Sequence, residues 1–151
     1  MPGIIVSDTS CLILLKKLGK LEILESLFKK ITVTQIIAQE FGKELPDFIE
    51  IEDPNNKNYQ RILETYLDPG EASAIALALE KEKCLLILDD NKARKEAKQL
   101  NLTFTGTIGI IIVAKEKGLL DSINDLVNEI RESDFRISES LLEEMIRKSN
   151  E

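Results

Sequence analysis

Four acidic residues stand at predicted strand ends or on inward helix faces: Asp8, Glu40, Glu71 and Asp90. Asp8 follows the apolar run Ile4–Val6, and Asp90 follows the apolar run Cys84–Leu88 after one further aspartate, Asp89. Open α/β sheets bind ligands at the carboxyl ends of their parallel strands. Carboxylates suit hard cations such as Mg²⁺ and Mn²⁺, which activate water and stabilise the leaving oxygen of a phosphodiester. The pattern therefore indicates metal-dependent phosphodiester hydrolysis.

Each of these acids also has a simpler structural explanation. Asp8 and Asp90 precede predicted helices, so either side chain could be an N-cap. Glu71 lies in the first turn of a helix that follows Pro69-Gly70, where the helix dipole favours an acid. Taken singly, the structural explanation is favoured for each of the three. The combination favours a shared site, because clustered carboxylates repel one another unless cations intervene.

Glu40 is predicted to lie on the inward face of a helix that begins after Thr34. It follows Ile36 by four residues and Ile37 by three, and we expect the helix to bury both together with Phe41. A buried carboxylate needs a partner. We expect either a lysine or a bound cation to meet Glu40.

The composition excludes several kinds of active site. The chain of 151 residues contains no histidine, which excludes Ser-His and Cys-His pairs and imidazole ligands. Two separated cysteines without histidine cannot complete a structural zinc site. The net charge of −7 is unusual for a nucleic-acid-binding protein, unless bound cations neutralise the acids.

Short β-rich runs alternate with amphipathic helices, which predicts an α/β fold with a mostly parallel sheet. Strands are expected at residues 3–6, 31–33, 84–88 and 102–105, with a weaker one at 48–52. Helices are expected at residues 9–18, 21–28, 35–41, 59–67, 71–79, 91–100, 107–118, 122–132 and 138–148. We expect one domain over residues 1–151, with a core at about 1–118 and C-terminal helices at about 119–151.

The location is predicted from what the chain lacks. The N-terminus does not look like a signal peptide, and no segment approaches the roughly 20 apolar residues of a membrane span. Cys11 and Cys84 lie in apolar runs, as expected of buried thiols in a reducing compartment. We therefore expect a cytoplasmic protein that does not associate with membranes.

An ordered set of segments resembles the PIN-domain nucleases, and most closely their VapC-type toxin branch. The set consists of residues 5–10, 33–40, 70–75 and 87–90, followed by the step Thr105-Gly106-Thr107. The resemblance runs from the first strand to about Gly118, and its specificity lies in the order of the motifs rather than in any one of them.

The resemblance implies a three-layer α/β/α sandwich that cleaves RNA with Mg²⁺ or Mn²⁺. It implies that the catalytic, metal-binding residues are Asp8, Glu40, Glu71 and Asp90. Asp89 is the rival of Asp90, and Ser10, Asp89 and Thr107 are expected to support the site. A VapC-type protein is further expected to form a homodimer and to bind a small antitoxin protein.

Three basic residues follow the acidic turn and could meet RNA phosphates: Lys92, Arg94 and Lys95. Their simpler explanation is a solvated helix face, with an ion pair between Asp90 and Arg94 four residues apart.

The sequence also has features of functions other than RNA cleavage. Asp8-Thr9-Ser10 is similar to the nucleophile motif of haloacid-dehalogenase-type phosphatases, but Ser10 replaces their second aspartate. A receiver domain would carry paired acids after its first strand, whereas Asp89-Asp90 come late. A non-catalytic PIN-like module that binds RNA or protein is the strongest alternative to an enzyme.

Overall fold

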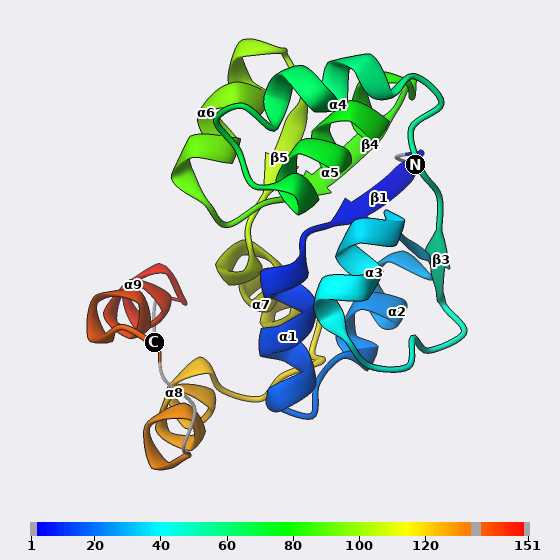
Figure 1. Ribbon diagram of the computed structural model, residues 1–151. Coiled ribbons are helices and arrows are strands. Elements are labelled where there is room, and N and C mark those ends of the chain that lie inside the picture. The colour runs from blue at the N-terminus through cyan, green and yellow to red at the C-terminus, as the bar shows by residue number, and fades with distance from the viewer. Residues whose placement is uncertain (1–2, 134–136, 150–151) are drawn as a thin grey trace.

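Five short parallel strands form one sheet in the computed structural model, which describes residues 3–133 and 137–149 (Figure 1). The strands are β1 (Ile4–Ser7), β2 (Ile31–Val33), β3 (Ile49–Ile51), β4 (Cys84–Ile87) and β5 (Thr103–Thr105). Their order is β3-β2-β1-β4-β5, and every pairing is parallel. The predicted parallel sheet is confirmed, and the weaker predicted strand is its edge strand β3.

The pairing of the two central strands positions the site. β1 and β4 pair from Ile4 opposite Cys84 to Ser7 opposite Ile87. Both strands become fully buried toward their carboxyl ends, as expected for a parallel sheet covered on both faces. The residues that follow Ser7 and Ile87 therefore leave the sheet side by side at the same edge.

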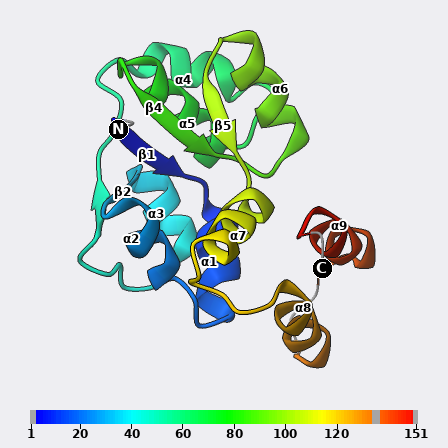
Figure 2. The ribbon, with the colours of Figure 1, turned by 180° about the vertical axis from the view of Figure 1, so that it is seen from behind.

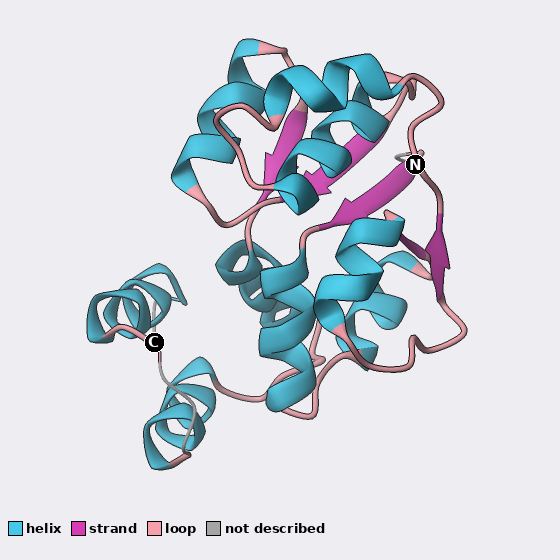
Figure 3. Cartoon of the chain, viewed as in Figure 1, coloured by secondary structure: helices cyan, strands magenta, loops and turns pink. Residues whose placement is uncertain are grey.

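Helices surround the sheet (Figures 2 and 3). They are α1 (Thr9–Lys17), α2 (Glu22–Phe28), α3 (Gln35–Phe41), α4 (Lys57–Leu63), α5 (Pro69–Leu79), α6 (Asn91–Gln99), α7 (Thr107–Glu116), α8 (Ile123–Glu132) and α9 (Glu139–Ser149). Helix α5 packs against β1 and β4 with α4 outside it, whereas α2 packs on β2 from the other face. The predicted three-layer α/β/α sandwich is confirmed.

Several helix boundaries differ from the predicted ones, and two of the differences have a clear physical reason. Helix α5 begins at Pro69 rather than Glu71, because Asp68 caps it and proline is well suited to the first helical position. Helix α4 ends at Leu63 rather than at Leu67. Leu67 continues the apolar period of the helix, but it is buried from the turn that follows.

The C-terminal helices add to the same hydrophobic core. In α8 the buried residues are Ile123, Leu126, Val127 and Ile130, and in α9 they are Leu142 and Met145. These helices pack on each other and on α7. None of the described helices is long and apolar enough to cross a membrane.

Candidate active site

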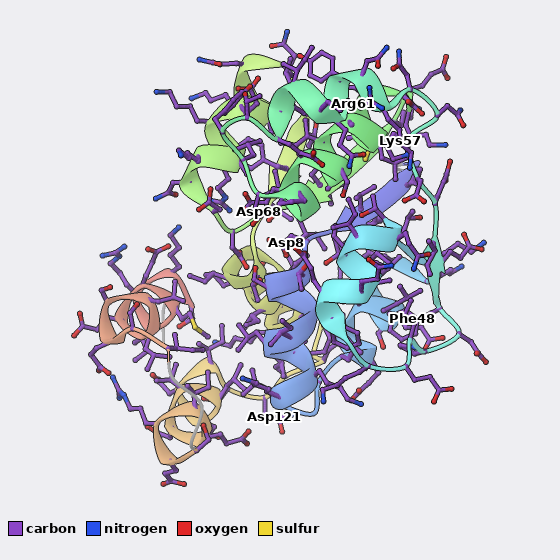
Figure 4. All side chains as sticks on the ribbon, in the orientation of Figure 1. Asp8, Phe48, Lys57, Arg61, Asp68 and Asp121 are labelled. Carbon is purple, nitrogen blue, oxygen red and sulfur yellow. The ribbon has the colours of Figure 1, made fainter. Side chains whose placement is uncertain are left out.

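The first acid, Asp8, joins the ends of β1 and β4. Its backbone N–H donates to the Ile87 carbonyl at 3.0 Å, which extends the β1–β4 ladder by one residue. The Asp89 N–H donates to Asp8 Oδ2 at 2.9 Å. Figure 4 shows Asp8 at the end of β1, with Asp68 above it. The prediction that the two strand-end acids share one edge is confirmed.

Asp8 is buried, with 6% of its surface exposed, and it caps α1 as the simpler explanation predicted. Oδ1 accepts from the Cys11 N–H at 3.0 Å, and Oδ2 accepts from Ser10 Oγ at 3.0 Å as well as from Asp89. Burial and then the Asp89 charge raise the pKa of Asp8 from 3.8 to about 6, against these hydrogen bonds. The Asp8 carboxyl therefore stays protonated to a higher pH than an exposed capping aspartate would.

Asp89 is held by the residues predicted to support the site. Its Oδ1 accepts from the Thr107 N–H at 2.8 Å, and its Oδ2 accepts from Thr107 Oγ1 at 2.6 Å. Ser10 Oγ contacts the same oxygen at 2.9 Å, so Ser10 bridges Asp8 and Asp89. The network ties the start of α1 to the start of α7.

We call the edge of the sheet near Asp8, Glu40, Glu71, Asp89 and Asp90 the acidic rim. Asp90 and Glu71 lie on the side of this rim toward α5. Asp90 is exposed and caps α6, since its Oδ2 accepts from the Ala93 N–H at 3.0 Å. The pKa of Glu71 rises from 4.5 to about 7, through burial first and then the charges of Asp68, Asp90 and Asp8. The charges of both strand-end acids, Asp8 and Asp90, therefore contribute to the raised pKa of Glu71.

Asp68 and Glu71 form a capping box at the start of α5. Asp68 Oδ1 accepts from the Glu71 N–H at 2.8 Å, and the Asp68 N–H bonds back to the Glu71 carboxylate and opposes the rise in its pKa. The first-turn explanation for Glu71 is therefore confirmed as well. Asp68 was missed as part of the site, although the spacing Asp-x-x-Glu before an apolar helix signals such a box.

The predicted burial of Glu40 is wrong. Glu40 is exposed and Ile36 is only half-buried, because Glu40 lies in the last turn of a short helix and only Ile37 and Phe41 reach the core. Its Oε1 accepts from Thr9 Oγ1 at 2.5 Å, so of the two predicted partners the lysine is not the one found, and the side chain that contacts Glu40 is a hydroxyl.

Gly70 makes room for the Glu40 carboxylate. A Cβ atom at position 70 would lie 2.3 Å from Glu40 Oε1 and 3.2 Å from Oε2. The last turn of α3 thereby reaches the first turn of α5, next to Glu71. Thr9 and Gly70 were missed as site residues, because neither contact can be seen from neighbours in the sequence.

None of the acids at this edge forms an ion pair with a basic side chain in the part of the chain that the structure describes. The ion pairs among the described residues are Lys30–Glu50, Lys81–Glu52, Arg131–Glu139 and Lys148–Glu144. The nearest cation to Asp89 is Arg94, since a Cβ at Gly106 would lie 2.4 Å from Arg94 Nη2 and 3.0 Å from Asp89 Oδ1. This arrangement creates a strongly negative edge.

The three basic residues on α6 differ from one another. Arg94 Nε donates to the Leu88 carbonyl at 2.7 Å, and its guanidinium lies 5.3 Å from the centroid of the Phe104 ring. Glycine at 106 leaves space for Arg94, since a Cβ there would lie 2.4 Å from Nη2. Lys92 and Lys95 are exposed. The alternative ion pair with Asp90 does not occur among the ion pairs of residues 3–133 and 137–149.

A groove of about 790 Å³ opens beside Asp89, between α1, α7 and α9. Ser10, Asp89, Arg94 and Thr107 line it beside the acids, and mainly apolar side chains line the rest, together with Glu144 and Lys148 of α9. The acidic rim is therefore accessible from this side.

A family model described as a PIN domain matches residues 4–151. The chain belongs to the PIN-domain family. PIN domains are generally nucleases and typically use divalent metal ions. No curated protein matched the sequence. The resemblance to PIN-domain nucleases is confirmed at the level of the family, while the VapC-type branch stays a prediction.

The donors of this PIN domain fit a divalent cation by their chemistry. Hard cations prefer oxygen ligands, and a cation would relieve the repulsion that raises the pKa values of Asp8 and Glu71. Within the described part of the chain, however, no three His, Cys, Asp or Glu side chains are gathered closely enough to hold a metal ion. We therefore expect the acid side chains to rearrange when an ion binds.

Proposed function

We propose that this PIN domain is a Mg²⁺- or Mn²⁺-dependent endoribonuclease whose catalytic carboxylates are Asp8, Glu40, Glu71 and Asp90. The observation that supports this best is the negative edge itself. Acids from the ends of β1 and β4 and from α3 and α5 face this edge without an ion pair among the described residues, and repulsion among them contributes to the raised pKa values of Asp8 and Glu71.

The hydrogen bonds favour different roles for the two adjacent aspartates. Both oxygens of Asp89 accept hydrogen bonds, from Thr107 and Ser10. Asp90 uses only Oδ2 in the hydrogen bonds found among the described residues. We therefore assign Asp90 as a metal ligand, and Asp89, Ser10 and Thr107 as positioning residues that hold Asp8 and the end of β4.

The four acids would hold one or two divalent ions. Such ions supply an activated water and stabilise charge on the leaving oxygen of the phosphodiester. The residues of the chain orient this chemistry: Thr9 and Gly70 fix the Glu40 carboxylate, and the Asp68 cap fixes Glu71. Exposed Lys92 and Lys95, and the remaining N–H groups of Arg94, would contact phosphates of the RNA.

The proposed partners and cellular role rest on the resemblance to VapC-type toxins. They are a homodimer, a small antitoxin protein that blocks the site, and a toxin function in the cytoplasm. Free Cys11 and Cys84 are compatible with a reducing compartment.

Cleavage of a mixed pool of single-stranded RNA tests the proposed activity. Wild type is compared with Asp90→Asn and Glu71→Gln, each with Mg²⁺, Mn²⁺ or chelator. Asparagine at position 90 retains a good N-cap, so the variant loses charge without losing the start of α6. We expect metal-dependent cleavage by wild type and a loss of at least about 100-fold in both variants, the order of magnitude typical of an electrostatic catalytic group.

Glu80→Gln provides a matched control on the same helix as Glu71. Glu80 follows the last residue of α5, roughly 13 Å from Glu71 along the helix axis. Its variant should cleave like wild type. If wild type binds RNA without cutting it under any of these conditions, the non-catalytic binding module replaces the enzyme. Equal cleavage by all four proteins would reject the assignment of the acids.

A further inference from the structure

Both tyrosines of the chain lie exposed on one side of α4 and the turn after it. The chain contains two tyrosines and no tryptophan. Tyr59 is 38% exposed, Ile62 59% and Tyr66 42%. Tyr59 and Ile62, three residues apart, share one face of α4 beside the buried Gln60 and Leu63, and Tyr66 follows in the turn after the helix. We call Tyr59, Ile62 and Tyr66 the tyrosine strip.

The strip is not an extension of the core. The described phenylalanines, at positions 28, 41, 48 and 104, pack in or against the hydrophobic core. Tyr59 and Tyr66, by contrast, present their rings to solvent from a helix that already buries its opposite apolar residues. Exposed aromatic rings gathered in this way indicate a binding surface rather than a packing defect.

The strip leads to the acidic rim. Tyr66 precedes the α5 cap Asp68 by two residues, and the Glu96 carboxylate on α6 lies close enough to its hydroxyl to raise the pKa of Tyr66. Lys92 lies one helical turn before Glu96 on α6 and is exposed. Lys92 also follows Asp90 by two residues. A line of aromatic and basic side chains therefore runs from Tyr59 past Tyr66 and Lys92 to the acids.

Aromatic faces beside lysines are the usual means of binding single-stranded nucleic acid, because every base has a face that can stack and every phosphate is an anion. Tyr59 lies on α4 and Tyr66 in the turn that follows it, and both are exposed, so each ring could stack on a base. We propose that the tyrosine strip is a base-stacking surface for the single-stranded RNA on one side of the cleaved bond, an inference that rests on the proposed nuclease function.

A second copy of the chain is the competing occupant, and the size of the strip argues against it. A stable interface buries roughly 800 Å² on each partner. Three partly exposed side chains supply only a fraction of that area. The exposed lysines Lys92 and Lys95 on the neighbouring helix, which together outweigh the charge of Glu96, suit phosphates better than a dry interface.

Intrinsic tyrosine fluorescence tests the inference directly, because Tyr59 and Tyr66 are the only tyrosines and tryptophan is absent. The full chain, in chelator to prevent cleavage, is titrated with oligouridine and with an abasic oligomer of equal length. N-acetyl-tyrosinamide corrects for light absorbed by the RNA. We expect oligouridine to quench the emission at concentrations where the abasic oligomer, with the same phosphates, does not.

Substitutions separate stacking from a structural role. Tyr66→Ala should weaken binding of a labelled oligouridine by about 5- to 100-fold, as expected for the loss of one stacked base. Tyr66→Phe keeps the ring and should bind within about twofold of wild type. Val113→Ala removes an equally exposed apolar side chain, 40% exposed on α7, and should have no effect.

Unchanged emission on RNA binding would overturn the inference, as would a Tyr66→Ala variant that binds like wild type. Self-association that Tyr66→Ala abolishes, without any change in RNA binding, would assign the strip to a second copy instead. Cleavage is measured separately with Mg²⁺ or Mn²⁺. Cleavage without quenching would reject the base-stacking role of the tyrosine strip and retain the nuclease. Quenching without cleavage would retain the base-stacking role and reject the nuclease.

Discussion

Asp8 shows how one buried side chain can serve both the fold and a proposed site. Its two oxygens accept from Cys11, Ser10 and Asp89, and these bonds fix the start of α1 and the end of β4. The same burial keeps its pKa high, so the carboxylate is costly when ionised. A side chain that only capped a helix would be more favourable on the surface. This contrast supports a second role for Asp8.

Gly70 offers a test of whether the position of Glu40 matters for activity. In Gly70→Ala the new Cβ would displace the Glu40 carboxylate, the flexible end of that side chain. The variant should keep or gain stability, by up to about 1 kcal/mol, because alanine is a better helix residue than glycine. RNA cleavage should fall by at least about tenfold, the equivalent of roughly 1.4 kcal/mol in the barrier. Urea denaturation and initial cleavage rates measure the two effects.

A double mutant gives the control for this prediction. If Gly70 acts through Glu40, then Gly70→Ala should cost no further activity in a Glu40→Ala background. A full additional loss in that background would mean that Gly70 affects the site by another route, such as the orientation of Glu71.

At the residue scale the sequence identified acids better than it identified their surroundings. Asp8 follows β1 directly and Asp90 follows β4 by three residues, so their location at the rim could be inferred from local order along the chain. Glu40 was wrongly expected to be buried, because helical periodicity shows the direction of a side chain but not how far the core extends. Thr9 lies 31 positions from Glu40, and no local pattern reveals that contact.

Among the elements, α6 combines a fixed arginine with solvent-exposed lysines. Arg94 is bound to the Leu88 carbonyl and lies over Phe104, so it joins α6 to the ends of β4 and β5. Lys95 extends from the same helix without such contacts among its described hydrogen bonds and ion pairs. Arg94 and Lys95 carry the same charge, but we expect them to contribute differently to the free energy of unfolding.

Arg94→Ala should lower the free energy of unfolding by about 1–3 kcal/mol, since it leaves a carbonyl without its donor and removes packing on a ring. Lys95→Ala should change it by less than about 0.5 kcal/mol. Urea denaturation of both variants beside wild type measures the difference. Equal stability of the two variants would show that the Arg94 contacts contribute nothing.

The elements themselves were largely predictable. Apolar runs bounded by glycine, proline or aspartate located the strands, and β2 was predicted at its observed bounds, Ile31–Val33. The order of the strands was not predictable, because β1 pairs with β4 across some 80 residues. The end of α4 was missed because Leu67 continues the helical apolar period from a turn.

Across the whole molecule, the acidic rim couples folding to pH. The pKa of Asp8 rises from 3.8 to about 6 and that of Glu71 from 4.5 to about 7 in the folded chain. The native state therefore holds these protons more tightly than the unfolded state. Without metal, the free energy of unfolding should decrease as pH rises from about 4 to about 7.

Urea denaturation in chelator over this pH range checks the direction. Asp8, which is 6% exposed, should account for at most about 3 kcal/mol of the decrease, from a pKa change of roughly two units. Glu71→Gln should flatten the upper part of the profile. Glu80→Gln should not, because backbone N–H groups lower the pKa of Glu80. A stability that rises over this range in wild type would contradict the electrostatic account of the rim.

A divalent cation should oppose the decrease in the free energy of unfolding at higher pH, because it binds the ionised acids of the native state in competition with protons. The increase in melting temperature on adding Mg²⁺ should therefore be larger at pH 8 than at pH 5. An ion present at 100 times its dissociation constant stabilises the native state by about 2.7 kcal/mol. Glu71→Gln should lose most of the increase at pH 8, whereas Glu80→Gln should retain it. An equal increase at both pH values, or in both variants, would mean that the cation binds outside the acidic rim.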